Sequence, residues 1–173
     1  YHCGPMAVDA VGELIAILQK NDPNTRIFVL NTLMGIGPEA KDAIPTVMKM
    51  LDSDDFHTQY WACRALGAIG PEASCATGKL AHLVTTGVTS VRRNAAKALG
   101  NIGPSVGEEG VHALLEGLND PNQPVKQQAV IALGKLKPVA ESAADKIEAL
   151  LKQKPRHFSP RAEAAKSLWQ LRP

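Results

Sequence analysis

The segment Leu66-Gly67-Ala68-Ile69-Gly70-Pro71 decides the fold, because close copies of it recur along the chain. The copy before it is Leu33-Met34-Gly35-Ile36-Gly37-Pro38, and the copy after it is Leu99-Gly100-Asn101-Ile102-Gly103-Pro104. Weaker copies begin at Leu133 and Leu168, so these five anchor leucines lie 33, 33, 34 and 35 residues apart. A steady period of this length is typical of solenoids built from stacked helix pairs.

Each period contains two helical patterns. After Pro38, apolar side chains recur at helical spacing as far as Leu51, which predicts a first helix, helix A, over 38–51. A polar turn such as 52–55 follows, and a second helix, helix B, runs to the next Gly-Pro, where Gly supplies a left-handed residue and Pro forbids continuation. We expect five A/B pairs, at approximately 5–37, 38–70, 71–103, 104–137 and 138–173, and no strands.

Helix B carries small side chains in two columns counted back from the anchor leucine. The position four before it holds Val29, Ala62, Ala95, Ala129 and Ala164, and the position one before it holds Thr32, Ala65, Ala98, Ala132 and Ser167. Small residues let neighbouring helices approach closely, and one pair alone cannot bury its apolar face. The predicted fold is therefore all-α: a right-handed α–α superhelix of about five pairs, convex on its A helices and concave on its B helices.

With these residues the chain resembles the HEAT-repeat family, in particular its short, Ala-rich bacterial members that include the phycobilisome-lyase HEAT-like repeats. The Leu-x-x-Ile-Gly-Pro anchors, the turn aspartates and a helix-B cation carry the resemblance, which spans essentially the whole chain. It implies the solenoid fold. It implies little about activity, since the family includes scaffolds, lyase subunits, metal oxygenases and DNA glycosylases.

The resemblance also implies a ladder of contacts between successive repeats. In the family, the turn aspartate and the helix-B cation tie neighbouring repeats together. The turn aspartates here are Asp22 and Asp55, and the cation column, seven before each anchor, reads Arg26, Gln59, Arg92, Lys126 and Arg161. Gln59 departs from the pattern, which puts the link of the second repeat in doubt.

Charge is sorted between the two helix sets although the total is nearly balanced. The chain has 19 Lys+Arg against 17 Asp+Glu, a formal net charge of +2, which argues against binding nucleic acid by bulk electrostatics. Helix A carries most of the acids, whereas helix B, past its caps, carries only Glu163. The helix-B cations are Arg26, Arg64, Arg92, Arg93, Lys97, Lys126, Lys135, Arg161 and Lys166. We expect a positive concave face that steers an oppositely charged partner.

The middle of that face is the candidate binding site. The columns two and six before the anchor are expected to face the groove, and aromatic and arginine side chains gather there as in interaction hot spots. The candidate partner-binding residues are Tyr60, Trp61, Arg64, Arg93, Asn94, Lys97 and Lys166. In the alternative interpretation, Tyr60 and Trp61 pack between the layers, as is expected of Phe28, and the cations are ordinary solvated surface or contacts between repeats.

No pattern of catalytic or metal-binding residues emerges. No two of the five histidines are three or four residues apart and none is followed by Glu, and the three cysteines form no C-x-x-C pair. Gly35 to Ala40 matches a dinucleotide fingerprint, but a helix rather than a strand precedes it. Cys63 is expected to be a buried small residue. We predict no catalytic residue, metal or cofactor, and no enzyme.

These observations predict a non-catalytic protein-interaction scaffold that binds an acidic or mixed protein surface through the B-helix face. A bilin-lyase-like or chromophore-handling subunit and a nucleic-acid binder are the alternatives. No apolar run approaches the ~20 residues of a bilayer span, so we expect a soluble chain, with a cytoplasmic location favoured. Apolar end helices suggest a module of a longer protein that self-associates through its exposed end repeats.

Overall fold

The computed structural model describes residues 5–20 and 22–136, and within them it is built from helices and turns without strands. The helices are α1 (Pro5–Leu18), α2 (Pro23–Ile36), α3 (Ile44–Met50), α4 (Phe56–Ile69), α5 (Thr77–Thr86), α6 (Thr89–Ile102), α7 (Gly107–Gly117) and α8 (Gln123–Lys135). Three 3-10 segments, η1 (Gly37–Ala43), η2 (Pro71–Ala76) and η3 (Gly103–Val106), connect them.

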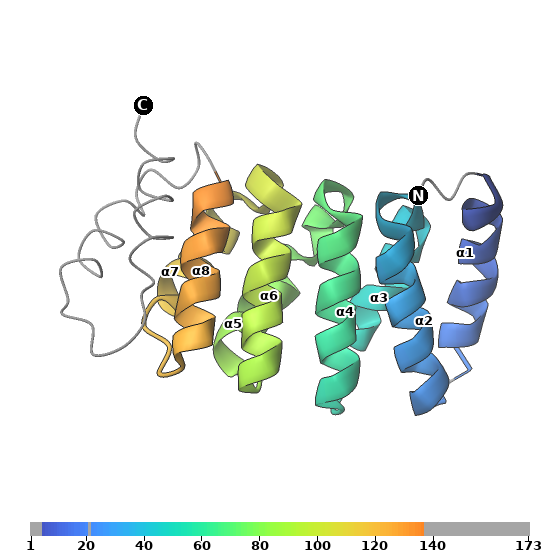
Figure 1. The fold of residues 1–173 in the computed structure, drawn as a ribbon, viewed down its shortest axis with the longest axis horizontal. Coiled ribbons are helices and arrows are strands. Elements are labelled where there is room, and N and C mark those ends of the chain that lie inside the picture. The colour runs from blue at the N-terminus through green and yellow to red at the C-terminus, as the bar shows by residue number, and fades with distance from the viewer. Residues whose placement is uncertain (1–4, 21, 137–173) are drawn as a thin grey trace.

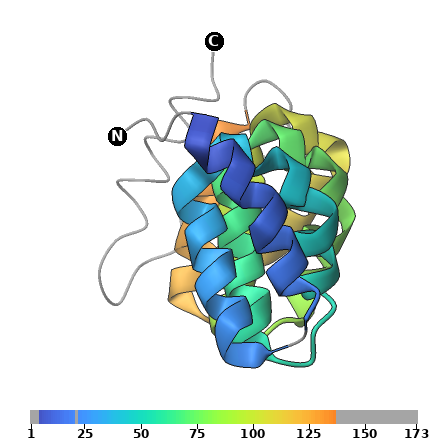
Figure 2. The same ribbon diagram turned by 90° about the vertical axis from the view of Figure 1, so that its right-hand side faces the viewer.

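The helices form two layers that run along the long axis of the molecule. The B helices α2, α4, α6 and α8 stand side by side, each packed on the next, and α3, α5 and α7 lie behind them (Figure 1). The view along the stack shows the two layers edge-on (Figure 2). The predicted class, a right-handed α–α superhelix of helix pairs, is confirmed. Four pairs are described, and the fifth expected pair, 138–173, lies outside the described residues.

The small-residue columns of helix B form the seam between successive B helices. Ala62, Ala95 and Ala129 have no exposed surface, and neither do the anchor leucines Leu66 and Leu99. The backbones approach so closely that a Cβ on Gly100 would lie 2.7 Å from the Ala132 Cα. Real Cβ contacts are essentially never that short, so this crossing requires glycine at Gly100 and alanine opposite it.

Each described B helix of the first three pairs ends on its anchor as predicted. The N–H groups of Gly37, Gly70 and Gly103 donate to the carbonyls of Leu33, Leu66 and Leu99, respectively. The backbone of Gly70 has φ 84° and ψ −141°, however, which is not the left-handed helical conformation we expected. It belongs to the extended region at positive φ that is essentially restricted to glycine. The glycine requirement is thus stricter than the sequence indicated.

The A helices differ from the continuous helix predicted over 38–51. The structure has the 3-10 segment η1 followed by the short helix α3, because Pro45 lies inside the predicted helix. Proline lacks the N–H that would bond the carbonyl four residues earlier, and its ring clashes with that carbonyl. The helix can therefore begin at Ile44 but cannot run through from Pro38. The next two A elements also open with 3-10 segments, η2 and η3, although no proline lies at the start of α5 or α7, so Pro45 accounts for the break in the second pair only.

Candidate functional site

A cluster of two aromatic rings and one arginine stands on α4. The Tyr60 and Trp61 rings meet edge to face, with 5.3 Å between their centroids. The Arg64 guanidinium lies 4.7 Å from the Trp61 ring centroid and 5.5 Å from that of Tyr60, and its Nη1 donates a hydrogen bond of 3.1 Å to the Tyr60 hydroxyl. Helical geometry explains the cluster, since Tyr60 and Arg64 are four residues apart on one face.

Tyr60 and Trp61 therefore combine the two interpretations that the sequence left open. Both are half-buried and pack against the hydrophobic core with part of their surface. The Arg64 guanidinium contacts their remaining faces by cation–π interaction, which restricts the conformations of this long side chain. The expectation for Phe28 is wrong: its side chain is 69% exposed on α2. Phe28 lies five residues before its anchor leucine. Asn94, at the same position on α6, is half-buried.

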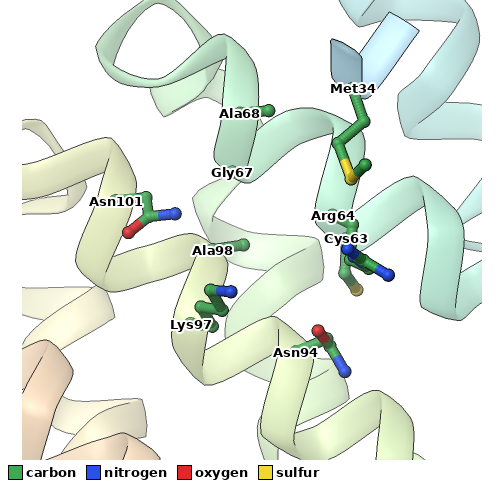
Figure 3. Close-up of a pocket in the computed structure, with 9 residues that line it drawn as sticks. All are labelled: Met34, Cys63, Arg64, Gly67, Ala68, Asn94, Lys97, Ala98 and Asn101. Atoms are coloured by element: carbon green, nitrogen blue, oxygen red, sulfur yellow. The ribbon is translucent and has the colours of Figure 1, made fainter. Parts of the chain in front are cut away.

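A small pocket opens between α4 and α6 next to this cluster (Figure 3). Its volume is about 110 Å³. The polar residues that line it are Arg64, Asn94, Lys97 and Asn101, and the apolar ones are Met34, Cys63, Gly67, Ala68 and Ala98. Three of these polar residues were predicted partner-binding residues, so the structure brings Arg64, Asn94 and Lys97 together at one pocket. Burial raises the pKa of the Cys63 thiol to about 12, as befits the buried small residue expected there.

Sequence reasoning missed Asn101 as a lining residue. It lies two positions after the anchor Leu99, inside the repeat segment that we treated as purely structural. The signal was present, because Asn94, Lys97 and Asn101 are three and then four residues apart and so share one face of α6. In the third pair the outward-facing stripe therefore runs through the anchor segment.

The remaining predicted residues lie apart from the pocket or outside the described residues. Arg93 is exposed on α6, and neither Arg93 nor Lys97 forms an ion pair with any acid in the described part of the chain. Lys166 and Arg161 belong to 137–173, which the structure does not describe.

The turn aspartates of the expected ladder cap the helices that follow them. Asp22 and Asp55 are N-caps: Asp22 accepts from the Thr25 N–H at 2.8 Å, and Asp55 accepts from the Thr58 N–H at 3.0 Å. The hydrogen bond from the Thr58 hydroxyl is the main reason why the pKa of Asp55 lies below its usual range. These capping hydrogen bonds stabilise the helix that each aspartate begins.

Arg92 makes the contact between repeats with another aspartate. Its Nε donates to Asp120 Oδ2 at 2.6 Å and its Nη2 to Oδ1 at 3.1 Å, while its Nη1 donates to the Gly87 carbonyl at 2.8 Å. Arg92 therefore ties the turn of its own repeat to the next turn. Gln59 makes the hydrogen bond to the turn of its own repeat, where its Nε2 donates to the Leu51 carbonyl at 3.3 Å, but it has no charge to pair with an aspartate of the next turn. Arg26 and Lys126 are half-buried in the same column.

Arg92, in the cation column, does not line the pocket, and its hydrogen bonds go to the turns between helices. Burial alone would raise the pKa of Asp120, but hydrogen bonds from Arg92 and from the Asn122 N–H outweigh it and lower that pKa. Arg92 is committed to this pair, whereas Arg64, Arg93 and Lys97 face outward on α4 and α6.

The A layer carries a second groove between α5 and α7, which is more open than the first pocket and has a volume of about 390 Å³. It is lined by Gly78, Ala81, His82, Thr85, Glu109, His112, Ala113 and Glu116. His82 and His112 are exposed there. In the described residues no three His, Cys, Asp or Glu side chains are placed to hold a metal ion, and no helix is long and apolar enough to cross a membrane.

Comparison with known proteins agrees with this architecture. A family model for HEAT repeats matches residues 11–86 and 79–169. No curated protein matches the sequence. A crystal structure of an engineered protein superposes with a TM-score of 0.74 at 23% identity, covering 93% of this chain and 78% of that one.

Two further solved structures share the fold. A designed armadillo repeat protein in complex with the peptide (KR)4 has a TM-score of 0.75 at 17% identity, covering 99% of this chain and 88% of that one. The complex of CpcE and CpcF of phycocyanin lyase from Nostoc sp. has a TM-score of 0.64 at 22% identity, covering 92% and 98%. At these identities the similarity extends to the fold alone.

Proposed function

Because the chain belongs to the HEAT-repeat family, we propose that it is a non-catalytic scaffold that binds a protein partner through the outward face of its B helices. The partner surface is acidic or mixed. The observation that carries this proposal is the arginine Arg64, held over Trp61 and Tyr60 beside Lys97, with no acid of the described chain paired to it. Aromatic and arginine side chains of this kind dominate the energetics of protein interfaces.

The packing of the two layers supports a concave B face. The B helices approach to backbone contact, since a Cβ on Gly67 would lie 2.9 Å from the Ala98 Cα. In the A layer, a Cβ on Gly78 of α5 would meet the Glu109 carboxylate of α7, at 3.3 Å, and no backbone atom of α7 closer than 3.8 Å. A stack that is tighter on one side curves toward that side, and a concave surface lets several helices contact one partner.

The family relationship favours the same kind of function. The designed armadillo repeat protein of similar fold was solved with a basic peptide bound, (KR)4. A peptide of opposite charge suits the present chain, because the outward residues of α4 and α6 include Arg64, Arg93 and Lys97. Complementary charge raises the rate of encounter and excludes partners of the wrong sign.

A chromophore-handling subunit is the second candidate, and the similarity in fold to the phycocyanin lyase complex is the observation in its favour. The pocket between α4 and α6 fits this candidate poorly. Its volume of about 110 Å³ is well below the ~300–1,000 Å³ of pockets that bury a drug-sized ligand. Absorbance spectra of the chain mixed with a free bilin would test it, and a stoichiometric spectral shift would favour it over the scaffold.

Selection of binders from a random displayed peptide library tests the scaffold proposal. We expect enrichment of peptides rich in Asp and Glu, and about tenfold or greater weakening of their binding by Arg93→Glu with Lys97→Glu. The matched control reverses Lys41 and Lys49, which are exposed on η1 and α3 of the other layer. Equal effects of the two double variants would contradict the assignment to the B face. Tighter binding of duplex or single-stranded DNA than of any selected peptide would favour a nucleic-acid partner instead.

A further inference from the structure

We propose that the pocket between α4 and α6 is a subsite for one side-chain carboxylate, an Asp or Glu of the partner. This inference rests on the proposed function and adds the chemistry of one contact to it. It depends on the direction in which each polar group of the pocket presents its donor or acceptor, and on the charge and size of the pocket.

Hydrogen bonds outside the pocket set the orientation of its two amides. The Asn101 Oδ1 accepts from Lys135 Nζ on α8 at 2.8 Å, so the Asn101 Nδ2 is left to donate. That nitrogen lies over Gly67, because a Cβ on Gly67 would be 3.6 Å from it. The Asn94 Nδ2 donates to the Ser90 carbonyl at 2.8 Å, so the Asn94 Oδ1 is left to accept. In Figure 3 the Asn101 nitrogen and the Asn94 oxygen both point toward the space between the helices.

Donors and positive charge therefore dominate the pocket. Arg64 and Lys97 bring two cations, Asn101 brings an oriented amide donor, and no carboxylate lines it. Arg64 is held in place by its contacts to Trp61 and Tyr60, so it does not have to be ordered when a ligand binds. Hydrogen bonds between such donors and an ionised acceptor are roughly twice as strong as neutral ones. The ligand group that fits is an anion that accepts several hydrogen bonds.

The size and the remaining acceptor favour a carboxylate on a short side chain. About 110 Å³ corresponds to between three and four water molecules, which is the room needed by a carboxylate and one or two methylenes. Met34, Ala68 and Ala98 supply the apolar surface that methylenes would contact. The Asn94 oxygen suits a peptide better than a free anion, because it would repel an anion's oxygens but accept a backbone N–H next to the acidic side chain.

Titration of the full chain with blocked peptides, followed by NMR of its side-chain amide and guanidinium signals, tests the proposal. The probe is acetyl-Gly-Asp-Gly-amide, and acetyl-Gly-Asn-Gly-amide is its uncharged counterpart. We expect saturable shifts of the Asn101 amide and the Arg64 Nε–H signals with the aspartyl peptide and none with the asparaginyl one. Acetyl-Gly-Gly-Gly with a free carboxylate and inorganic phosphate test the two other sources of an anion, and equal affinity for either would overturn the side-chain assignment.

Two variants connect the shifts to the pocket. Lys97→Gln should weaken the aspartyl peptide about three- to tenfold, because it removes one charged donor, whereas Lys49→Gln on the other layer should leave the affinity unchanged. Lys135 lies outside the pocket, but Lys135→Met removes the donor to the Asn101 oxygen, so the Asn101 amide signals should lose their response while those of Arg64 keep it. Absence of any saturable shift would overturn the subsite and leave the scaffold proposal standing if Arg93→Glu with Lys97→Glu still weakens the selected peptides.

Discussion

At the scale of single residues, the helix-B cations fall into two groups that the sequence alone does not separate. Arg92 is committed to Asp120, and both side chains are largely buried, with 15% and 6% of their surface exposed. Arg64 is fixed by aromatic rings instead, and its charge remains available. Adjacent columns of one helix thus differ in their surroundings, because a shift of one residue turns a helical side chain by about 100°, and we propose recognition only for the column that is not used between repeats.

The Arg92–Asp120 pair gives a prediction for stability. Asp120→Asn should lower the free energy of unfolding by about 1–3 kcal/mol at neutral pH, since it removes a bidentate charged hydrogen bond and leaves Arg92 without its counter-charge. Urea denaturation followed by circular dichroism measures it. In the double variant Arg92→Gln with Asp120→Asn, the loss should be smaller than the sum of the two single losses; strict additivity would show that the pair contributes nothing.

The pH dependence of this effect has a defined sign. The pKa of Asp120 is lower in the folded protein than in the unfolded chain, where it is about 3.9. The stabilisation is therefore complete above the unfolded pKa and is lost as the pH falls through the folded pKa. The difference between the wild type and Asp120→Asn should be greatest near pH 7 and should shrink below about pH 4. A difference that grows toward acid would contradict the assignment.

At the scale of helices, the glycine after the anchor leucine controls how closely two B helices pack. Gly67 and Gly100 face the alanines Ala98 and Ala132 of the following helix at backbone distance. Gly35 on α2 has open space around it, because a methyl group added there would meet no neighbouring atom within 4 Å. Glycine is therefore required for close packing directly after the anchor leucine, at Gly67 and Gly100, but not two residues after it, at Gly35.

This contrast predicts substitutions of opposite sign. Gly100→Ala should destabilise the fold by about 1–3 kcal/mol, because the new methyl group overlaps the Ala132 backbone of α8. Gly35→Ala should stabilise it by about 0.5–1 kcal/mol, the difference in helix propensity between the two residues. Thermal and urea denaturation of both variants measures the changes. Similar changes in the two variants would show that the close crossing of α6 and α8 does not limit the packing.

The repeat made the fold predictable at this scale, and the reasons for its failures are local. The buried columns and the Gly-Pro ends of the B helices followed from spacing, since only one face of each helix can pack on its neighbours. The predicted start of helix A was wrong: in the second pair Pro45 prevents a helix that runs through from Pro38, and the next two A elements open with 3-10 segments without such a proline. The Arg92–Asp120 contact was missed because Asp120 lies two residues before the N-cap position that Asp22 and Asp55 occupy.

At the scale of the whole molecule, the stacked pairs form two layers that share one core. The B helices α2, α4, α6 and α8 stand side by side along the stack, each packed on the next (Figure 1). A candidate site could be predicted to this level, because Arg64, Asn94 and Lys97 follow the repeat. The pocket itself could not, since it depends on which end of the Asn101 amide faces inward, and Lys135 on the next helix decides that.

The measurement that tests the central claim most directly is the ionic-strength dependence of the association rate between the full chain and a selected acidic peptide. For the wild type, the rate should fall steeply as salt rises, because the positive B face attracts the peptide and salt screens that attraction. Arg93→Glu with Lys97→Glu should slow association and flatten this dependence, whereas Lys41→Glu with Lys49→Glu, of the same total charge, should leave it close to that of the wild type. An unchanged slope in the first variant would contradict recognition through the B-helix face.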